Sequence, residues 1–174
     1  MTRTIDVDSQ RFRRVLGHLP TGVTVITAYG ADGPAGMAAN SVTSVSLDPP
    51  LVLFCPAKSS TTWPRLRQAG VVCINVLAAD HAELSRRFAA KGTDRFAGLD
   101  YEYRPAGPAL TGAVAWIECR LLEEHDAGDH TIVLADVVAL ETPDSRIPQP
   151  LVFFRGDYGS FLDRPGRLPD TMPG

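Results

Sequence analysis

Three clusters of small polar residues carry the side chains that could bind a ligand. The first runs from Ala38 to Ser46 and places hydroxyl and amide groups among small apolar residues on one expected strand. These groups offer hydrogen-bond donors and acceptors, and the small side chains let a flat ligand approach the backbone. The same pattern is also typical of an edge strand with a solvated polar face.

A second cluster, Lys58–Thr62, follows an apolar run and precedes an expected helix. Hydroxyl groups, backbone N–H groups at a helix start and one ammonium favour an anion, and a terminal phosphate is the natural occupant. Plain capping of the helix is the alternative, and it needs only one of the hydroxyls.

The third cluster, Gly128–Thr131, contains a histidine at the start of an expected strand. His130 can lie over a bound ring, where it orients a carboxamide or supplies a proton. A turn histidine exposed to solvent is the alternative. The four histidines do not cluster like metal ligands, and the sequence contains no nucleophile elbow, P-loop or H-E-x-x-H. Hydrolytic and metal chemistry are therefore not indicated.

Composition excludes several classes of partner. The 174 residues have a net charge of -3, 44% hydrophobic residues and no block of Lys or Arg, so no nucleic acid or membrane surface is expected. No segment approaches the roughly 20 apolar residues of a membrane span. Cys55, Cys73 and Cys119 each lie in an apolar run and are expected to be buried thiols. The protein is predicted to be cytoplasmic.

Periodicity predicts a series of strands with three short helices. Helices are expected at 8–19, with Asp8 or Ser9 as N-cap, and within 61–70, with Thr61 or Thr62 as N-cap and Gly70 at the end. A third helix is expected at 80–89, where Asp80 and Glu83 form a capping box. Strands are predicted at 22–30, 36–47, 51–55, which is expected to be buried on both faces, 71–77, 113–125, 130–141 and 151–159.

These elements predict a mainly β (α+β) fold, an antiparallel barrel with short inserted helices. The βαβ alternation and the G-x-G-x-x-G of a Rossmann domain are missing from the sequence. One domain is expected over 1–163, with 143–150 as a connecting loop and a Pro/Gly-rich, disordered tail at 164–174.

Seven ordered segments resemble the flavin reductase domain family, the small reductase components of two-component flavin-dependent monooxygenases. They are PTGVTVITA (20–28), GMAANSVTSVSLDPPLVLFC (36–55), KSST (58–61), INVL (74–77), RFA (87–89), GDHTIV (128–133) and PLVFFRGDY (150–158). The resemblance spans about residues 10–160.

The resemblance implies an FMN-binding, Greek-key split barrel that forms a homodimer. The implied activity is NAD(P)H:flavin oxidoreduction, in which NADH or NADPH reduces FMN or FAD and a partner monooxygenase receives the reduced flavin. An oxidase of the pyridoxamine-phosphate oxidase type that retains FMN, and a flavin carrier without turnover, are the alternatives.

The resemblance also implies roles for individual residues. The flavin ring and ribityl chain would contact Met37, Ala38, Ala39, Asn40 and Ser41, continue along Ser44, Val45 and Ser46, and meet Cys55, Pro56 and Ala57. The phosphate, or the start of an FAD adenylate, would lie among Lys58, Ser59, Ser60, Thr61, Arg87, Phe88 and Ala89. The nicotinamide would lie by His130, as the catalytic residue, with Arg155, Gly156, Asp157 and Tyr158 nearby.

Overall fold

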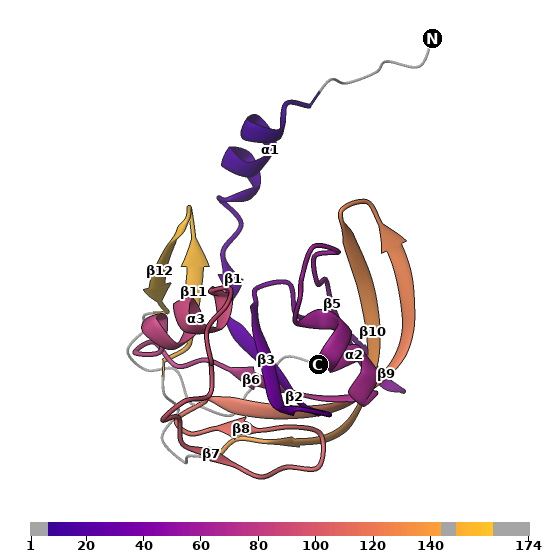
Figure 1. Ribbon diagram of the computed structural model, residues 1–174. Helices are drawn as coiled ribbons and strands as arrows, with labels where there is room; N and C mark the ends of the chain where they lie inside the picture. Colours follow the sequence, from indigo (N-terminus) through magenta and orange to yellow (C-terminus); the bar gives the residue numbers. More distant parts are fainter. Residues whose placement is uncertain (1–6, 144–148, 162–174) are drawn as a thin grey trace.

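A seven-stranded antiparallel sheet dominates the structure (Figure 1). The computed structural model describes residues 7–143 and 149–161. In sheet order the strands are β3 (Gly33–Ala39), β2 (Thr24–Gly30), β6 (Val71–Val76), β9 (Ala115–Ala127), β10 (His130–Glu141), β5 (Pro50–Phe54) and β4 (Thr43–Leu47). Among the described residues every pair of neighbouring strands is antiparallel, as predicted.

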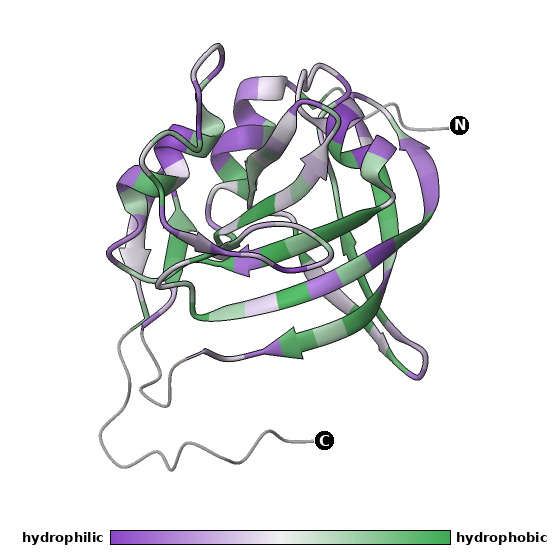
Figure 2. Ribbon diagram, turned by 60° about the horizontal axis from the view of Figure 1, so that its bottom comes forward, coloured by the Kyte–Doolittle hydropathy of each residue, from purple (hydrophilic) through white to green (hydrophobic). Residues whose placement is uncertain are grey.

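The sheet is curled because its two edge strands follow one another in the chain. β3 and β4 lie at opposite edges, yet only residues 40–42 separate them. The four steps from Ala39 to Thr43 span at most about 14 Å, so the edges must approach each other. Figure 2 shows hydrophobic residues along much of the long, curved strands and hydrophilic residues on turns and helix surfaces.

Two small sheets and three helices complete the described fold. The strands β1 (Thr21–Gly22), β11 (Leu151–Phe154) and β12 (Asp157–Ser160) form one sheet, and β7 (Tyr101–Glu102) and β8 (Ala109–Leu110) form the other. Helix α2 (Trp63–Ala69) packs on β2, β3 and β6, and α3 (Ala82–Ala89) packs on β3 and β2. Helix α1 (Ser9–Leu16) projects from the body and buries none of its residues (Figure 1).

The predicted helices exist, but at two of them the capping differs from the prediction. Asp8 caps α1 as expected, since its carboxylate accepts the N–H groups of Gln10 and Arg11, and Gly70 ends α2 in the left-handed conformation. Thr62 occupies the N-cap position of helix α2, as expected, but its side chain makes no capping hydrogen bond. The Ser60 hydroxyl instead accepts the N–H groups of Thr62 and Trp63.

No capping box forms at α3. His81 occupies the N-cap position without a side-chain cap. The Glu83 carboxylate pairs instead with the Arg86 guanidinium one turn along the helix, and Asp80 lies 3.9 Å from the His81 ring. Because the N-cap is His81 and not Asp80, Glu83 is the second helical residue and not the third, so the predicted capping box is wrong.

Three strand predictions also need correction. The expected strand 36–47 is two strands, β3 and β4, which end and begin on either side of residues 40–42, where no Gly or Pro marks the break. The expected strand 151–159 is the hairpin β11–β12, which turns at Arg155 and Gly156, with φ of 53° and 86°. Strand β5 is fully buried on one face only, since Val52 and Phe54 are buried while Leu51 and Leu53 are half-buried.

The remaining segments agree with the prediction where they are described. The hairpin β9–β10 forms as expected, with Ala127 opposite His130. The tail 164–174 and residues 144–148 of the connecting loop lie outside the described residues.

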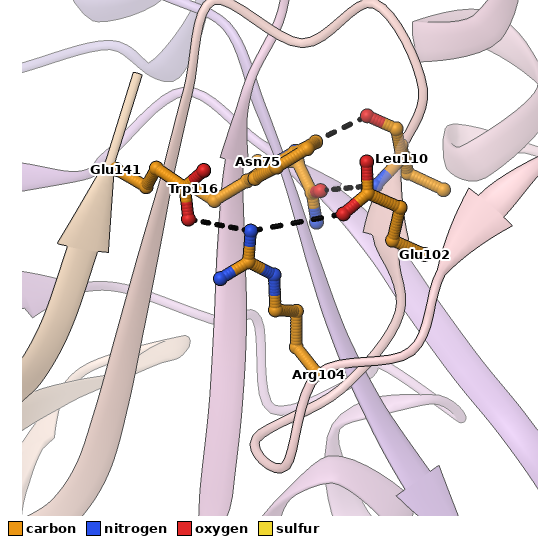
Figure 3. Close-up of polar contacts among 6 residues, drawn as sticks. All are labelled: Asn75, Glu102, Arg104, Leu110, Trp116 and Glu141. Carbon is orange, nitrogen blue, oxygen red and sulfur yellow. Dashed lines mark hydrogen bonds and ion pairs between the residues drawn. The ribbon is translucent and has the colours of Figure 1, made fainter. Parts of the chain in front are cut away.

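A buried amide fastens the segment 104–113 to the sheet. The Asn75 Nδ2 donates to the carbonyl oxygens of Val25 at 3.0 Å and Pro108 at 3.3 Å, and Oδ1 accepts the N–H of Leu110 at 2.7 Å. The Leu110 carbonyl in turn accepts the indole N–H of Trp116 (Figure 3). One side chain therefore satisfies backbone groups from two separate segments, β2 and the 104–113 segment.

Arg104 makes further contacts at the start of the 104–113 segment. The Arg104 guanidinium pairs with the carboxylates of Glu102 and Glu141 and lies 4.8 Å from the centre of the Trp116 ring (Figure 3). Gly107, at φ 153°, lies so close to β2 that an added Cβ would come 2.5 Å from the Thr27 carbonyl oxygen. The 104–113 segment is thus held by specific contacts at Arg104 and at Gly107.

Replacing Asn75 by leucine is expected to lower the free energy of unfolding by about 3 kcal/mol, because buried backbone groups lose their partner. Urea denaturation followed by tryptophan fluorescence measures the change. The control Thr43→Val alters an exposed strand residue and should change stability by less than about 0.5 kcal/mol. Equal stability of Asn75→Leu and the unmodified protein would show that this network does not stabilise the fold.

Candidate functional site

A cavity of about 310 Å³ lies where the edge strands approach each other. It brings together residues from the 37–41 segment, the segment after β5, the end of α3 and the β9–β10 turn. Its lining is Met37, Ala38, Ala39, Asn40, Ser41, Cys55, Pro56, Ala57, Ser59, Ser60, Thr61, Thr62, Phe88, Ala89, Lys91, Arg95 and His130. All three polar clusters of the sequence therefore contribute to one cavity.

The two walls of the cavity are joined by the Ser41 hydroxyl. Ser41 lies in the crossover between β3 and β4, and its Oγ accepts the N–H of Cys55 at 2.9 Å. Opposite walls are thus held at a fixed separation. Met37, Pro56 and Phe88 give the walls a buried apolar part, and Ala38 and Ala39 have small side chains.

A glycine allows α3 to reach the cavity. A Cβ on Gly36 would lie 2.7 Å from Cε1 of Phe88, so any larger residue would displace the ring. With glycine at this position, Phe88 packs directly on β3 with 1% of its surface exposed. Ala89 follows it into the cavity lining.

Backbone pairing carries His130 to the cavity. Beyond the end of β5, the N–H of Thr131 donates to the Pro56 carbonyl at 3.0 Å and the N–H of Lys58 donates to the Asp129 carbonyl at 2.9 Å. A bridge between Ala57 and His130 lies between these two bonds. The backbone of the histidine is consequently fixed beside the Cys55–Ala57 wall, while 44% of its side chain stays exposed to solvent.

The His130 ring is oriented by its neighbour. Its Nδ1 lies 2.8 Å from Oδ1 of Asp129, and this hydrogen bond holds the pKa of Asp129 below its usual value. When Nδ1 carries the proton and donates to the carboxylate, Nε2 is an acceptor. The pair therefore selects which ring nitrogen is available to a ligand.

The KSST segment is divided between the cavity and the surface. Ser59, Ser60 and Thr61 line the cavity, and the capping alternative applies to Ser60 alone. The Lys58 ammonium is not part of the lining and donates to Oδ1 of Asp126 at 2.7 Å. This hydrogen bond holds the pKa of Asp126 below its usual value. The role of Lys58 toward a phosphate stays a prediction.

Several predicted site residues lie outside this cavity. Ser44, Val45 and Ser46 are on the edge strand β4, where the register shifts between Ser44 and Ser46. The Arg87 guanidinium donates to the carbonyl oxygens of Asp94 and Ala97. The residues Arg155, Gly156 and Asp157 form and follow the β11–β12 turn.

Tyr158 reaches an adjoining cavity. This space of about 140 Å³ shares Ala38, Ala39 and Asn40 with the larger one. The Tyr158 hydroxyl lies 2.9 Å from the Ser85 Oγ, and the Arg86 guanidinium lies 5.0 Å from the centre of the Tyr158 ring. The last hairpin is therefore attached to α3 beside the site.

Two lining residues were not predicted: Lys91 and Arg95. Arg95 donates to the Gly36 carbonyl and to the Thr62 hydroxyl, each at 2.7 Å. Burial, and then the like charge of Arg65, lower the pKa of Arg95. Lys91 follows the RFA segment by two residues, which was an available signal, whereas Arg95 lies in an irregular stretch without periodicity.

The residues present fit a flavin. The apolar part of the lining, with Met37, Pro56 and Phe88, suits a ring system. The hydroxyls of Ser59 and Thr61 with the charges of Lys91 and Arg95 suit a phosphate. Among the described residues no group of three or more His, Cys, Asp or Glu could hold a metal ion. No described helix is both long and apolar enough to cross a membrane.

Residues 16–162 match the family described as flavin reductase like domain. The chain belongs to this family. It is 48% identical over 159 residues to the flavin reductase of Pseudomonas putida, covering 89% of this chain and 91% of that protein. It is 43% identical over 153 residues to the reductase subunit HsaB of a flavin-dependent monooxygenase from Mycobacterium tuberculosis. This match covers 87% of this chain and 82% of that protein.

A solved structure gives the same result for the fold. The NADH:FAD oxidoreductase SgcE6 of Streptomyces globisporus C-1027, in complex with NAD and FAD fragments, is 38% identical and superposes with a TM-score of 0.82. The match covers 89% of this chain and 93% of that one. The resemblance and the mainly β, split-barrel fold class predicted from the sequence are confirmed.

Thiol reactivity tests the burial of the three cysteines. Burial raises the pKa of Cys73 and of Cys119 to about 12, so at pH 8 about one in ten thousand of these thiols is ionised. Only the half-buried Cys55 should react with a disulfide reagent in the native protein, and a bound flavin should slow it. The variant Cys55→Ser should be unreactive until denatured. Rapid labelling of Cys73 or Cys119 in the folded protein would contradict this account.

Proposed function

We propose that the protein is an NAD(P)H:flavin oxidoreductase that reduces FMN or FAD and supplies the reduced flavin to a partner monooxygenase. The observation that carries the proposal is the single cavity in which Met37–Ser41, Cys55–Ala57 and His130 meet. The membership of the flavin reductase like domain family supports it. So do the names of the relatives, which include a flavin reductase and a monooxygenase reductase subunit.

The residues of the site act mainly by positioning. When bound, a flavin supplies the group that accepts a hydride from the nicotinamide. Met37–Ser41 and Cys55–Ala57 would hold its ring, while Ser59, Thr61, Lys91 and Arg95 would hold its phosphate. His130, oriented by Asp129, would place the nicotinamide beside the ring. The cavity opens to solvent, which suits a flavin that enters and leaves.

We infer that the protein forms a homodimer and is located in the cytoplasm. Helix α1 exposes Phe12, Val15 and Leu16, and Leu19 follows it, with 46% to 63% of the surface of each residue accessible. An apolar face of this kind is stabilised when a second copy covers it. The three cysteines are free thiols, as is usual in a reducing compartment.

Flavin-dependent NAD(P)H oxidation tests the activity. The rate should rise with added free flavin until it saturates, because flavin is a substrate that is released. A rate independent of added flavin would indicate an oxidase that retains FMN. Flavin binding without NAD(P)H oxidation would indicate a carrier. Either result would contradict the proposed function.

Replacing His130 by alanine should raise the KM for NAD(P)H about tenfold, because a positioning contact of roughly 1.4 kcal/mol is lost. The Kd for flavin should change less than twofold. Steady-state kinetics and a flavin titration measure the two effects. The matched control is His125→Ala, an exposed β9 residue near Glu123 and outside the cavity. Loss of flavin binding with a normal KM would assign His130 to the flavin instead.

A further inference from the structure

A second and larger cavity adjoins the proposed flavin site. It has a volume of about 480 Å³ and shares Thr61, Thr62 and Arg95 with the first cavity. Both volumes fall within the range of roughly 300 to 1,000 Å³ typical of small-molecule sites. Its lining is Asp32, Pro34, Ala35, Gly36, Thr61, Thr62, Arg65, Gly92, Thr93, Asp94, Arg95, Phe96 and Ala97.

Two arginines give this second cavity its chemistry. Arg65 is exposed on α2, and its side chain passes the end of β2, where a Cβ on Gly30 would lie 3.7 Å from its Nε. Arg95 is half-buried between the two cavities. Within the described part of the chain, no ion pair neutralises either guanidinium. An anion at this junction would meet both charges.

The arrangement is fixed before any ligand binds. Arg95 donates through Nη1 to Gly36 and Thr62 and through Nε to the Ala90 carbonyl at 3.0 Å. Arg65 and Arg95 line the same cavity, and burial of Arg95, followed by the like charge of Arg65, lowers the pKa of Arg95. An anionic ligand would relieve this repulsion.

The rest of the wall suits a nucleoside. Pro34, Ala35 and Phe96 give it an apolar part, and the Phe96 ring is held edge-on by Phe88 at 5.2 Å and Tyr101 at 5.7 Å between ring centres. Asp32, at the β2–β3 turn, offers a carboxylate that can accept hydrogen bonds from ribose hydroxyls. The Asp94 Oδ1 is already occupied by the N–H of Phe96.

We propose that the second cavity binds the adenylate half of FAD, with Arg65 and Arg95 on its pyrophosphate, so that the protein prefers FAD to FMN. This inference rests on the proposed flavin reductase function. NAD(P)H carries the same adenylate, but the two cavities join at Thr61 and Thr62, the end expected to hold the flavin phosphate. His130, the expected nicotinamide contact, does not line the second cavity.

Calorimetric titration with FAD, FMN and ADP tests the assignment. The unmodified protein should bind FAD at least about tenfold more tightly than FMN, and ADP should compete with FAD. The variant Arg65→Ala should weaken FAD binding about tenfold and FMN binding less than twofold. Arg65→Lys, which keeps the charge, should recover part of the loss.

Arg67→Ala is the matched control. Arg67 lies on the same helix, pairs with Glu124 at 2.7 Å and does not line the second cavity, so its removal should leave the ratio of FAD to FMN affinity unchanged. Equal loss of FAD and FMN affinity in Arg65→Ala, or no loss of either, would overturn the proposal.

A kinetic measurement distinguishes the adenylate of FAD from that of NAD(P)H. With FMN as acceptor, the KM for NADH should be the same in Arg65→Ala and the unmodified protein. A raised KM with unchanged FAD affinity would assign the cavity to the nicotinamide cofactor and overturn the proposal. The titrations need no turnover, so a protein that discriminated FAD from FMN but oxidised no NAD(P)H would refute the proposed activity alone.

Discussion

The short crossover between β3 and β4 is the constraint on which the site depends. Because only residues 40–42 join strands at opposite edges of a seven-stranded sheet, the sheet must curl until those edges approach each other. The hydrogen bond from the Cys55 N–H to the Ser41 hydroxyl lies at this closure. The same crossover therefore closes the barrel and brings the two cavity walls together. The small residues at 38–41 serve both purposes.

The second element of the site follows from backbone pairing. The ladder between β5 and β10 continues past the end of β5 through Pro56–Lys58, and it places His130 beside the cavity without using its side chain. The imidazole is then free for chemistry, with Asp129 selecting its orientation. On the far side of the sheet, Asn75 and Arg104 hold the 104–113 segment with polar contacts that have no direct part in the site.

The sequence predicted those features that depend on local chemistry. Asp8 as a cap, Gly70 as a helix end and the β9–β10 hairpin follow from side-chain and turn preferences within a few residues. The lining segments Met37–Ser41, Cys55–Ala57 and Ser59–Thr61 were recognised because their residue types are unusual in an apolar barrel and together resemble a known family. The break at 40–42 was missed because no Gly or Pro marks it.

Features that depend on distant partners could not be predicted. Thr61, Thr62 and Ser60 are equivalent by residue type, and only the path of the chain before α2 selects the Ser60 hydroxyl for the capping hydrogen bond. Arg95 has no periodic context, and its place between two cavities follows from its contact with Gly36, 59 residues earlier in the chain.

A crystal structure of the protein with oxidised flavin tests the central claim most directly. The account predicts that the ring lies between residues 37–41 and 55–57, with His130 at its exposed edge and the phosphate beside Thr61. A flavin bound elsewhere, with the cavity beside Ser41 and Cys55 filled only by water, would contradict it.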